Sequence, residues 1–194
     1  MTDQTPASGA VFETYRRYLA FLARLHVGSR PNPKLDLSGI VQQTLLEAYQ
    51  DQSQWTSLNA TQRMAFLRRV LAHNVHDEMR KLTAEKRDIH REQSLEQEFE
   101  ESSHQLLNFL AVESSSPSRT MGQAEQALQL AAALDRLPEA QREALILQHW
   151  EGLSLADIAT HMERTPAAVA GLLKRGLQHL RAELGEAMDP EADG

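Results

Sequence analysis

The stretch that decides the fold reads LSLADIATHMERTPAAVAGLLKRGLQHLR, from Leu153 to Arg181. It predicts two short helices joined by a tight turn. Ser154 followed by Asp157 is a capping-box pattern, and Thr165 followed by Pro166 is a typical start of a second helix. Such a pair is the arrangement of a helix-turn-helix, whose second helix enters the major groove of DNA.

The apolar residues of this stretch suit two helices that cross closely. Ala159 is small at the expected crossing, and Ile158, Val169 and Leu173 form an apolar seam. The front of the second helix offers few polar side chains to the bases. The residues expected to face DNA are Arg164, Thr165, Ala167 and Ala168, with Lys174 and Arg175 placed to contact phosphates.

The rest of the chain shows helical periodicity, and no stretch alternates convincingly with a period of two, so the sequence predicts an all-α fold. Apolar residues recur every three or four positions over 11–26, 37–49 and 61–91, which predicts a three-helix bundle. Residues 92–120 are acidic and serine-rich and read as a linker. We therefore expect helical domains over 10–91 and 121–185, and a disordered tail over 186–194.

Charge is distributed unevenly over the 194 residues, whose formal net charge is −7. Residues 63–91 sum to +4, whereas residues 92–123 sum to −5 and residues 124–194 to −6. Within the last block, the span from Arg164 to Arg181 holds four basic residues and no acid. Two positive islands in an acidic chain indicate two contacts with nucleic acid.

Several classes of site and location are disfavoured by composition. The chain has no cysteine, which excludes disulfides and thiolate metal sites and fits a reducing compartment. The N-terminus has no signal-peptide pattern, and no run near 18 apolar residues occurs, so we expect a cytoplasmic protein without a membrane segment. The sequence indicates no cofactor.

Three blocks resemble the extracytoplasmic-function sigma factors, the smallest members of the bacterial sigma-70 family. LPEAQREALILQHWEGLSLADIA, residues 137–159, resembles their fourth conserved region. DLSGIVQQTLLEAY, residues 36–49, resembles their polymerase-binding helix, and AFLRRVLAHNVHDEMRKL, residues 65–82, resembles the helix that recognises and melts the −10 promoter element. The resemblance covers most of residues 10–185 and implies a non-enzymatic protein that directs transcription initiation.

The resemblance also implies partners and contact residues. Core RNA polymerase would contact Ile40, Val41, Gln42, Gln43, Leu46 and Glu47. The −10 element of promoter DNA would contact Asn74, Arg68, Arg69, Arg80 and Lys81, together with Ser57 and Asn59 of the loop that captures a flipped base. The helix-turn-helix residues would contact the −35 element, where Glu163 replaces a frequent turn glycine and Ala170 and Leu172 replace basic residues. An anti-sigma factor could be a further partner.

A sigma factor also reconciles DNA binding with an acidic chain. A free-standing DNA-binding protein needs enough positive charge for its own affinity, because phosphate neutralisation supplies much of the binding free energy. The resemblance implies that polymerase makes most of the DNA contacts instead.

Three other interpretations fit parts of the sequence. A response-regulator-type activator would share the helix-turn-helix but not the block over residues 65–82. His73, His76 and Asp77 lie on one expected helix face and could ligate a metal, as in HD-type phosphohydrolases. A helical adaptor without nucleic-acid contacts is the third.

Overall fold

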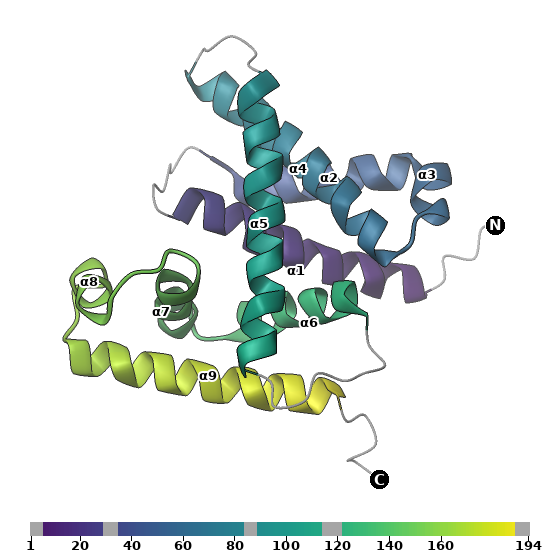
Figure 1. The fold of residues 1–194 in the computed structure, drawn as a ribbon. Coiled ribbons are helices and arrows are strands. Elements are labelled where there is room, and N and C mark those ends of the chain that lie inside the picture. The colour runs from purple at the N-terminus through teal and green to yellow at the C-terminus, as the bar shows by residue number, and fades with distance from the viewer. Residues whose placement is uncertain (1–5, 29–34, 84–88, 114–121, 189–194) are drawn as a thin grey trace.

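The computed structural model describes residues 6–28, 35–83, 89–113 and 122–188. All regular elements in these ranges are helices, which confirms the all-α prediction (Figure 1). They are α1 (Pro6–Gly28), α2 (Leu37–Gln50), α3 (Gln52–Ser57), α4 (Ala60–Thr83), α5 (Ile89–Glu113), α6 (Gln123–Arg136), α7 (Glu139–His149), α8 (Leu155–His161) and α9 (Pro166–Met188). Among these helices, none has both the length and the apolar character required to cross a bilayer.

Helices α1, α2 and α4 form the expected bundle. Leu19 and Leu22 of α1 and Leu67 and Leu71 of α4 are fully buried, as the helical spacing predicts. The Asp36 side chain caps α2 by accepting a hydrogen bond from the Gly39 backbone N–H at 2.9 Å. The short helix α3 ends at Ser57, where the expected loop begins, and it carries the buried Trp55.

The first difference from the sequence prediction concerns α4 and α5. The helix expected over 61–91 ends at Thr83, and a new helix begins at Ile89. The expected linker, residues 92–120, is helical as far as Glu113. Leu95, Phe99, Leu106 and Phe109 of α5 are buried, because their spacing of four, seven and three residues places them on one face. Helix α5 contacts α4, α1 and α6 (Figure 1).

The C-terminal helices α6 to α9 follow the predicted order. The helix after Pro138 ends at His149, and Gly152 takes a left-handed φ of 67° as the Leu153 N–H bonds back to the Leu147 carbonyl at 2.9 Å. Helix α9 contacts both α6 and α7, and it crosses α7 (Figure 1). It continues to Met188, so the first three residues of the expected tail are helical and residues 189–194 lie outside the described part.

The N-terminal and C-terminal helices pack against each other. Helices α1 and α6 are in extensive contact, and Arg24 Nη1 of α1 lies 3.1 Å from Asp135 Oδ1 of α6. Trp150, just after α7, packs against two rings: its ring centroid lies 5.2 Å from that of Phe21 in α1 and 5.5 Å from that of Phe109 in α5. The described buried residues therefore form one continuous hydrophobic cluster. The division into domains at 10–91 and 121–185 remains a prediction.

Candidate nucleic-acid interface

The helix-turn-helix consists of α8, a turn and α9. The Ser154 hydroxyl accepts from the Asp157 N–H at 3.3 Å, and the Thr165 hydroxyl accepts from the Ala168 N–H at 3.2 Å. Both predicted N-caps are therefore present. In the turn, the Arg164 N–H donates to the Ala159 carbonyl at 2.9 Å, which fixes the start of α9 relative to α8.

The apolar seam between α8 and α9 is also as predicted. Ile158, Ala159, Val169 and Leu173 are buried. Leu172 is buried too, at 9% exposure, so it packs inside and does not take the place of a surface cation. Ala170 is exposed.

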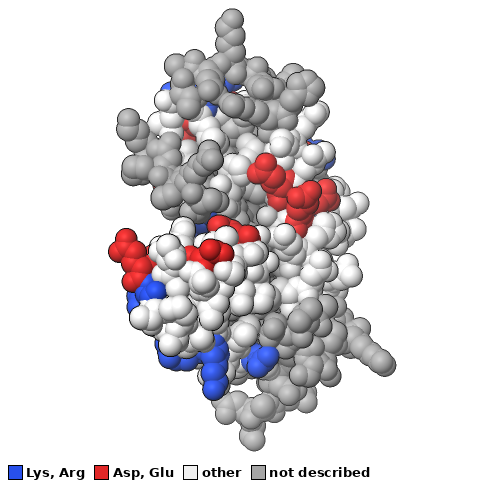
Figure 2. Space-filling model, turned by 60° about the vertical axis from the view of Figure 1, so that its left-hand side comes forward, with Lys and Arg blue, Asp and Glu red and all other residues white. Residues whose placement is uncertain are grey.

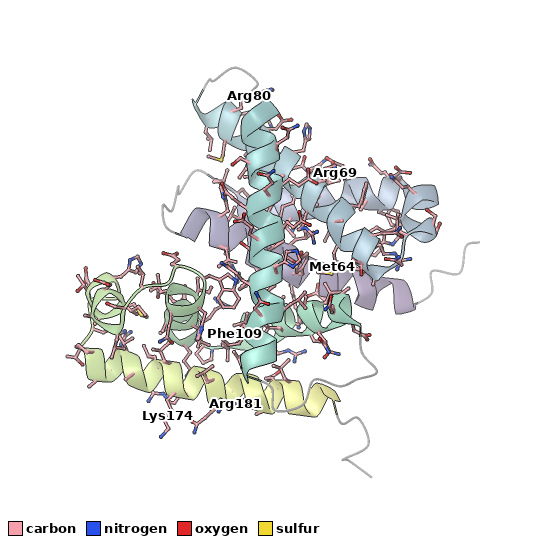
Figure 3. The ribbon with its side chains drawn as sticks, in the orientation of Figure 1. Met64, Arg69, Arg80, Phe109, Lys174 and Arg181 are labelled. Carbon is pink, nitrogen blue, oxygen red and sulfur yellow. The ribbon has the colours of Figure 1, made fainter. Side chains whose placement is uncertain are left out.

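All six residues expected to face the −35 element are exposed. They are Arg164, Thr165, Ala167, Ala168, Lys174 and Arg175. Lys174 and Arg181 project from α9 on the side away from α7 (Figure 3). Basic side chains gather at the level of α9 on the face shown in Figure 2, and acidic ones gather across its middle. The structure thus presents one basic and alanine-rich helix face to solvent.

Glu163 holds the turn in a backbone conformation that favours glycine. Its φ is 52°, and among the described non-glycine residues it is the one with a positive φ. The Glu163 N–H donates to the Thr160 carbonyl at 3.2 Å. This left-handed geometry explains why glycine would be frequent at the position.

The four basic residues expected at the −10 element all lie on α4, but their side chains have acidic partners. Arg69 Nε lies 3.4 Å from Glu96 Oε1 of α5, and Arg80 Nη1 lies 3.6 Å from Asp77 Oδ1. Lys81 Nζ lies 2.8 Å from Glu78 Oε2, and this hydrogen bond raises the pKa of the Lys81 ammonium. The ion pairs are within reach of water, so each contributes little to stability.

Arg68 is different because its side chain is only 12% exposed. Its Nη1 donates to the Tyr18 hydroxyl at 3.2 Å, and its Nη2 lies 3.6 Å from Glu100 Oε1 of α5. The Tyr18 hydroxyl in turn donates to Ser103 Oγ of α5 at 3.0 Å, and burial raises the pKa of Tyr18. In this structure Arg68 therefore joins α1, α4 and α5 and does not face solvent.

Asn74 lies in a groove between α2 and α4. Its Nδ2 donates to Thr44 Oγ1 at 3.2 Å, and the Thr44 hydroxyl donates to the Ile40 carbonyl at 2.9 Å. The groove is open on the surface and is also lined by Gln43, Glu47 and Lys81. Capture of a base by Asn74 would require its amide to leave Thr44.

Ser57 is the last residue of α3 and Asn59 lies in the α3–α4 connection, and both are exposed. Ser57 Oγ donates to the Gln54 carbonyl at 2.7 Å. Asn59 and Gln62 exchange two side-chain to backbone hydrogen bonds of 2.9 Å, which is a reciprocal capping box at the start of α4. These hydrogen bonds define the conformation of the connection.

The expected polymerase-binding residues of α2 fall into two groups. Ile40 and Val41 are only 6% and 3% exposed, because they pack against α1 and α4, so in this structure they lie in the core and their contact with polymerase stays a prediction. Gln42 and Gln43 are exposed, Leu46 is 48% exposed and Glu47 is half-buried. Tyr49, 50% exposed, completes this outward face one turn beyond Leu46 and was missed by the sequence analysis.

The residues of the alternative metal site do not converge. His73 Nε2 lies 3.4 Å from Asp77 Oδ2, whereas His76 is buried at 7% exposure. In the part of the chain that the structure describes, no group of three or more histidine, aspartate or glutamate side chains is arranged to hold a metal ion.

Comparison with known proteins bears on the helix-turn-helix directly. Residues 127–180 match the family model of sigma-70, region 4. The match begins in α6, includes α7 and α8, and ends in α9 at Leu180. No curated protein matches the chain significantly. Over these residues, which include the helix-turn-helix, the chain is similar to region 4 of the sigma-70 family.

Proposed function

We propose that the chain is a sigma factor of the extracytoplasmic-function group, which binds core RNA polymerase and directs promoter recognition and melting. The observation that carries the proposal is the helix-turn-helix, whose α9 front is exposed within the residues that match sigma-70 region 4. The proposal assigns α8 and α9 to the −35 element, α4 with the α3–α4 connection to the −10 element, and α2 to polymerase. It assigns no catalytic role to the chain.

The outward face of α2 supports the polymerase part of the proposal. Gln42, Leu46 and Tyr49 follow one another at spacings of four and three residues and lie on one side of the helix. Leu46 and Tyr49 are large apolar side chains that are about half exposed on the same helix face, and such a surface suits contact with a protein partner. The buried Ile40 and Val41 support this surface from beneath.

Reconstitution with core RNA polymerase tests the proposed function. Run-off transcription from a promoter library should depend on the chain, and the free chain should bind duplex DNA only non-specifically, with Kd of about 10⁻⁴ to 10⁻⁶ M at physiological salt. Sub-micromolar, sequence-specific binding by the free chain without transcription would instead identify an activator. Association with neither DNA nor polymerase would favour an adaptor.

The docking surface has its own test. Leu46→Asp should reduce core polymerase binding by at least tenfold in a pull-down titration, because it places a charge where an apolar contact is expected, without unfolding an exposed position. Leu82→Asp is the matched control, since Leu82 is an exposed leucine on α4. Equal binding by both variants would remove α2 from the proposal.

A further inference from the structure

The front of α9 lacks side-chain hydrogen-bond donors over its first two turns. Ala167, Ala168 and Ala170 are exposed there, and each presents a methyl group to solvent. Gly171 follows, and the guanidinium of Arg175 lies over it, because a Cβ built on Gly171 would be 3.2 Å from Arg175 Nη1. The surface formed by the three alanines is therefore apolar, and it is bordered by the charged side chains of Arg164 in the turn and of Lys174 and Arg175 further along α9.

The turn before α9 adds little direct base reading. The Thr165 hydroxyl accepts from the Ala168 N–H as the N-cap of α9, which ties it to the helix backbone and leaves its single O–H as a donor. Pro166 has no N–H to offer. Arg164 is exposed and is the one long polar side chain of the described residues between the turn glutamate and Lys174.

In the major groove, one feature of the bases is recognised by apolar contact, and this is the C5-methyl group of thymine. An exposed alanine methyl can pack against it without leaving a polar group unpaired. We propose that α9 recognises the −35 element through thymine methyl groups, with Ala167, Ala168 and Ala170 as its specificity-determining residues. This inference rests on the proposed function and specifies the DNA that it requires.

The changes in DNA affinity expected from such methyl contacts are small, which suits a chain that relies on polymerase for most of its affinity. Removing one methyl group from water is worth about a fourfold change in affinity. A bidentate hydrogen-bonded contact to a base discriminates by about 5- to 150-fold. Three alanine contacts would thus give a combined preference of about 60-fold, enough to place a holoenzyme that is already held at the −10 element.

Replacing thymine by deoxyuridine tests the inference, because this removes the methyl group and keeps the base pairing. Promoters are first selected from a random library with the full chain and core polymerase, and the selected duplex is resynthesised with one deoxyuridine at a time. We expect a three- to fivefold loss of binding at two or three positions of the −35 element. No loss at any of these positions would overturn the inference while leaving the proposed function intact. If no promoter is selected, the proposed function fails, and this inference fails with it.

Loss of a methyl group also changes DNA shape, so a second measurement isolates the contact with alanine. The loss of binding caused by each deoxyuridine is measured again with Ala167→Ser, Ala168→Ser and Ala170→Ser. For the variant whose alanine contacts the substituted thymine, the duplexes with thymine and with deoxyuridine should bind almost equally well. Ala182→Ser is the matched control, since Ala182 is an exposed alanine further along α9. A penalty that stays the same in all three front variants would assign it to DNA shape and overturn the inference.

Discussion

At the scale of single residues, Glu163 combines two unfavourable properties in the helix-turn-helix. Its φ of 52° places a residue with a Cβ in the left-handed region, which costs about 1–2 kcal/mol relative to an ordinary conformation. Its carboxylate also stands next to Arg164, on the surface proposed to meet phosphates. The first property acts on folding and the second on DNA binding, so two substitutions can separate them.

Glu163→Gly should relieve the backbone, and Glu163→Gln should leave it unchanged while removing the charge. We expect Glu163→Gly to raise the free energy of unfolding by up to about 1 kcal/mol, because the relief is partly offset by the greater entropy of glycine in the unfolded chain. Glu163→Gln should change it by less than about 0.5 kcal/mol. Urea denaturation measures both.

The same two variants should bind promoter DNA as holoenzyme with equally increased affinity, by a factor that falls as salt is raised. Titrations at two ionic strengths measure this factor. If Glu163→Gly gained affinity and Glu163→Gln did not, backbone geometry and not charge would control DNA binding at the turn.

The residues of α4 show how far the sequence can place a side chain. Periodicity puts Arg68 and Asn74 on α4, and that placement is correct. Their partners lie elsewhere in the chain: Tyr18 is 50 residues and Thr44 is 30 residues away. Helical spacing says nothing about such distant pairs, so the burial of Arg68 and the hydrogen bond of Asn74 could not be predicted.

At the scale of helices, the crossing of α7 and α9 depends on a glycine. A Cβ built on Gly176 would lie 2.9 Å from Leu145 Cδ1 and 3.5 Å from Gln141 Cβ, so these side chains of α7 pack directly on the backbone of α9 at Gly176. Close by, His179 Nδ1 and Gln141 Oε1 are 2.9 Å apart, which adds a polar contact between α9 and α7. This crossing sets the direction in which the alanine-rich front of α9 projects.

Gly176→Ala should therefore destabilise the fold, although alanine is the better helix former. We expect a loss of about 1–3 kcal/mol in the free energy of unfolding, because the added methyl group overpacks the crossing. Gly185→Ala is the control in the same helix, where a Cβ meets nothing within 4 Å. It should stabilise the fold by about 0.5–1 kcal/mol through helix propensity. Thermal unfolding of both variants gives the comparison, and two shifts of the same sign would contradict the close crossing.

Helix α5 shows where composition and periodicity disagree. Its acids and serines favour a linker, whereas Phe99, Leu106 and Phe109 recur with helical spacing and are buried. Periodicity was the better guide, because an apolar stripe of this kind can be buried only against other helices. What it buries against could not be read from the sequence, since α4, α1 and α6 each contribute part of that surface.

At the scale of the whole molecule, the packed arrangement and the proposed promoter contacts exclude each other. A compact chain of this length has a radius of gyration of about 16 Å and hence a diameter of about 42 Å. Elements named −10 and −35 lie about 25 base pairs apart, which is roughly 85 Å of duplex at 3.4 Å per base pair. One compact body cannot contact both. The proposed function therefore requires the α1–α6 interface and the cover of α5 over Arg68 to open when the chain binds a promoter.

A reversible crosslink across the α1–α6 interface tests this opening, and the absence of native cysteines makes the labelling specific. Arg24 and Asp135 pair across that interface at 3.1 Å. Arg24→Cys with Asp135→Cys, joined by a short reductant-cleavable thiol crosslinker, should transcribe at less than a tenth of the uncrosslinked rate and recover when the link is cleaved. The matched control is Arg136→Cys with Glu183→Cys, a pair of ion-paired residues on α6 and α9 within the C-terminal helices. Because this second link does not join α1 to α6, it should leave transcription unchanged. Full run-off transcription by the chain crosslinked at positions 24 and 135 would show that promoter engagement needs no separation of α1 from α6.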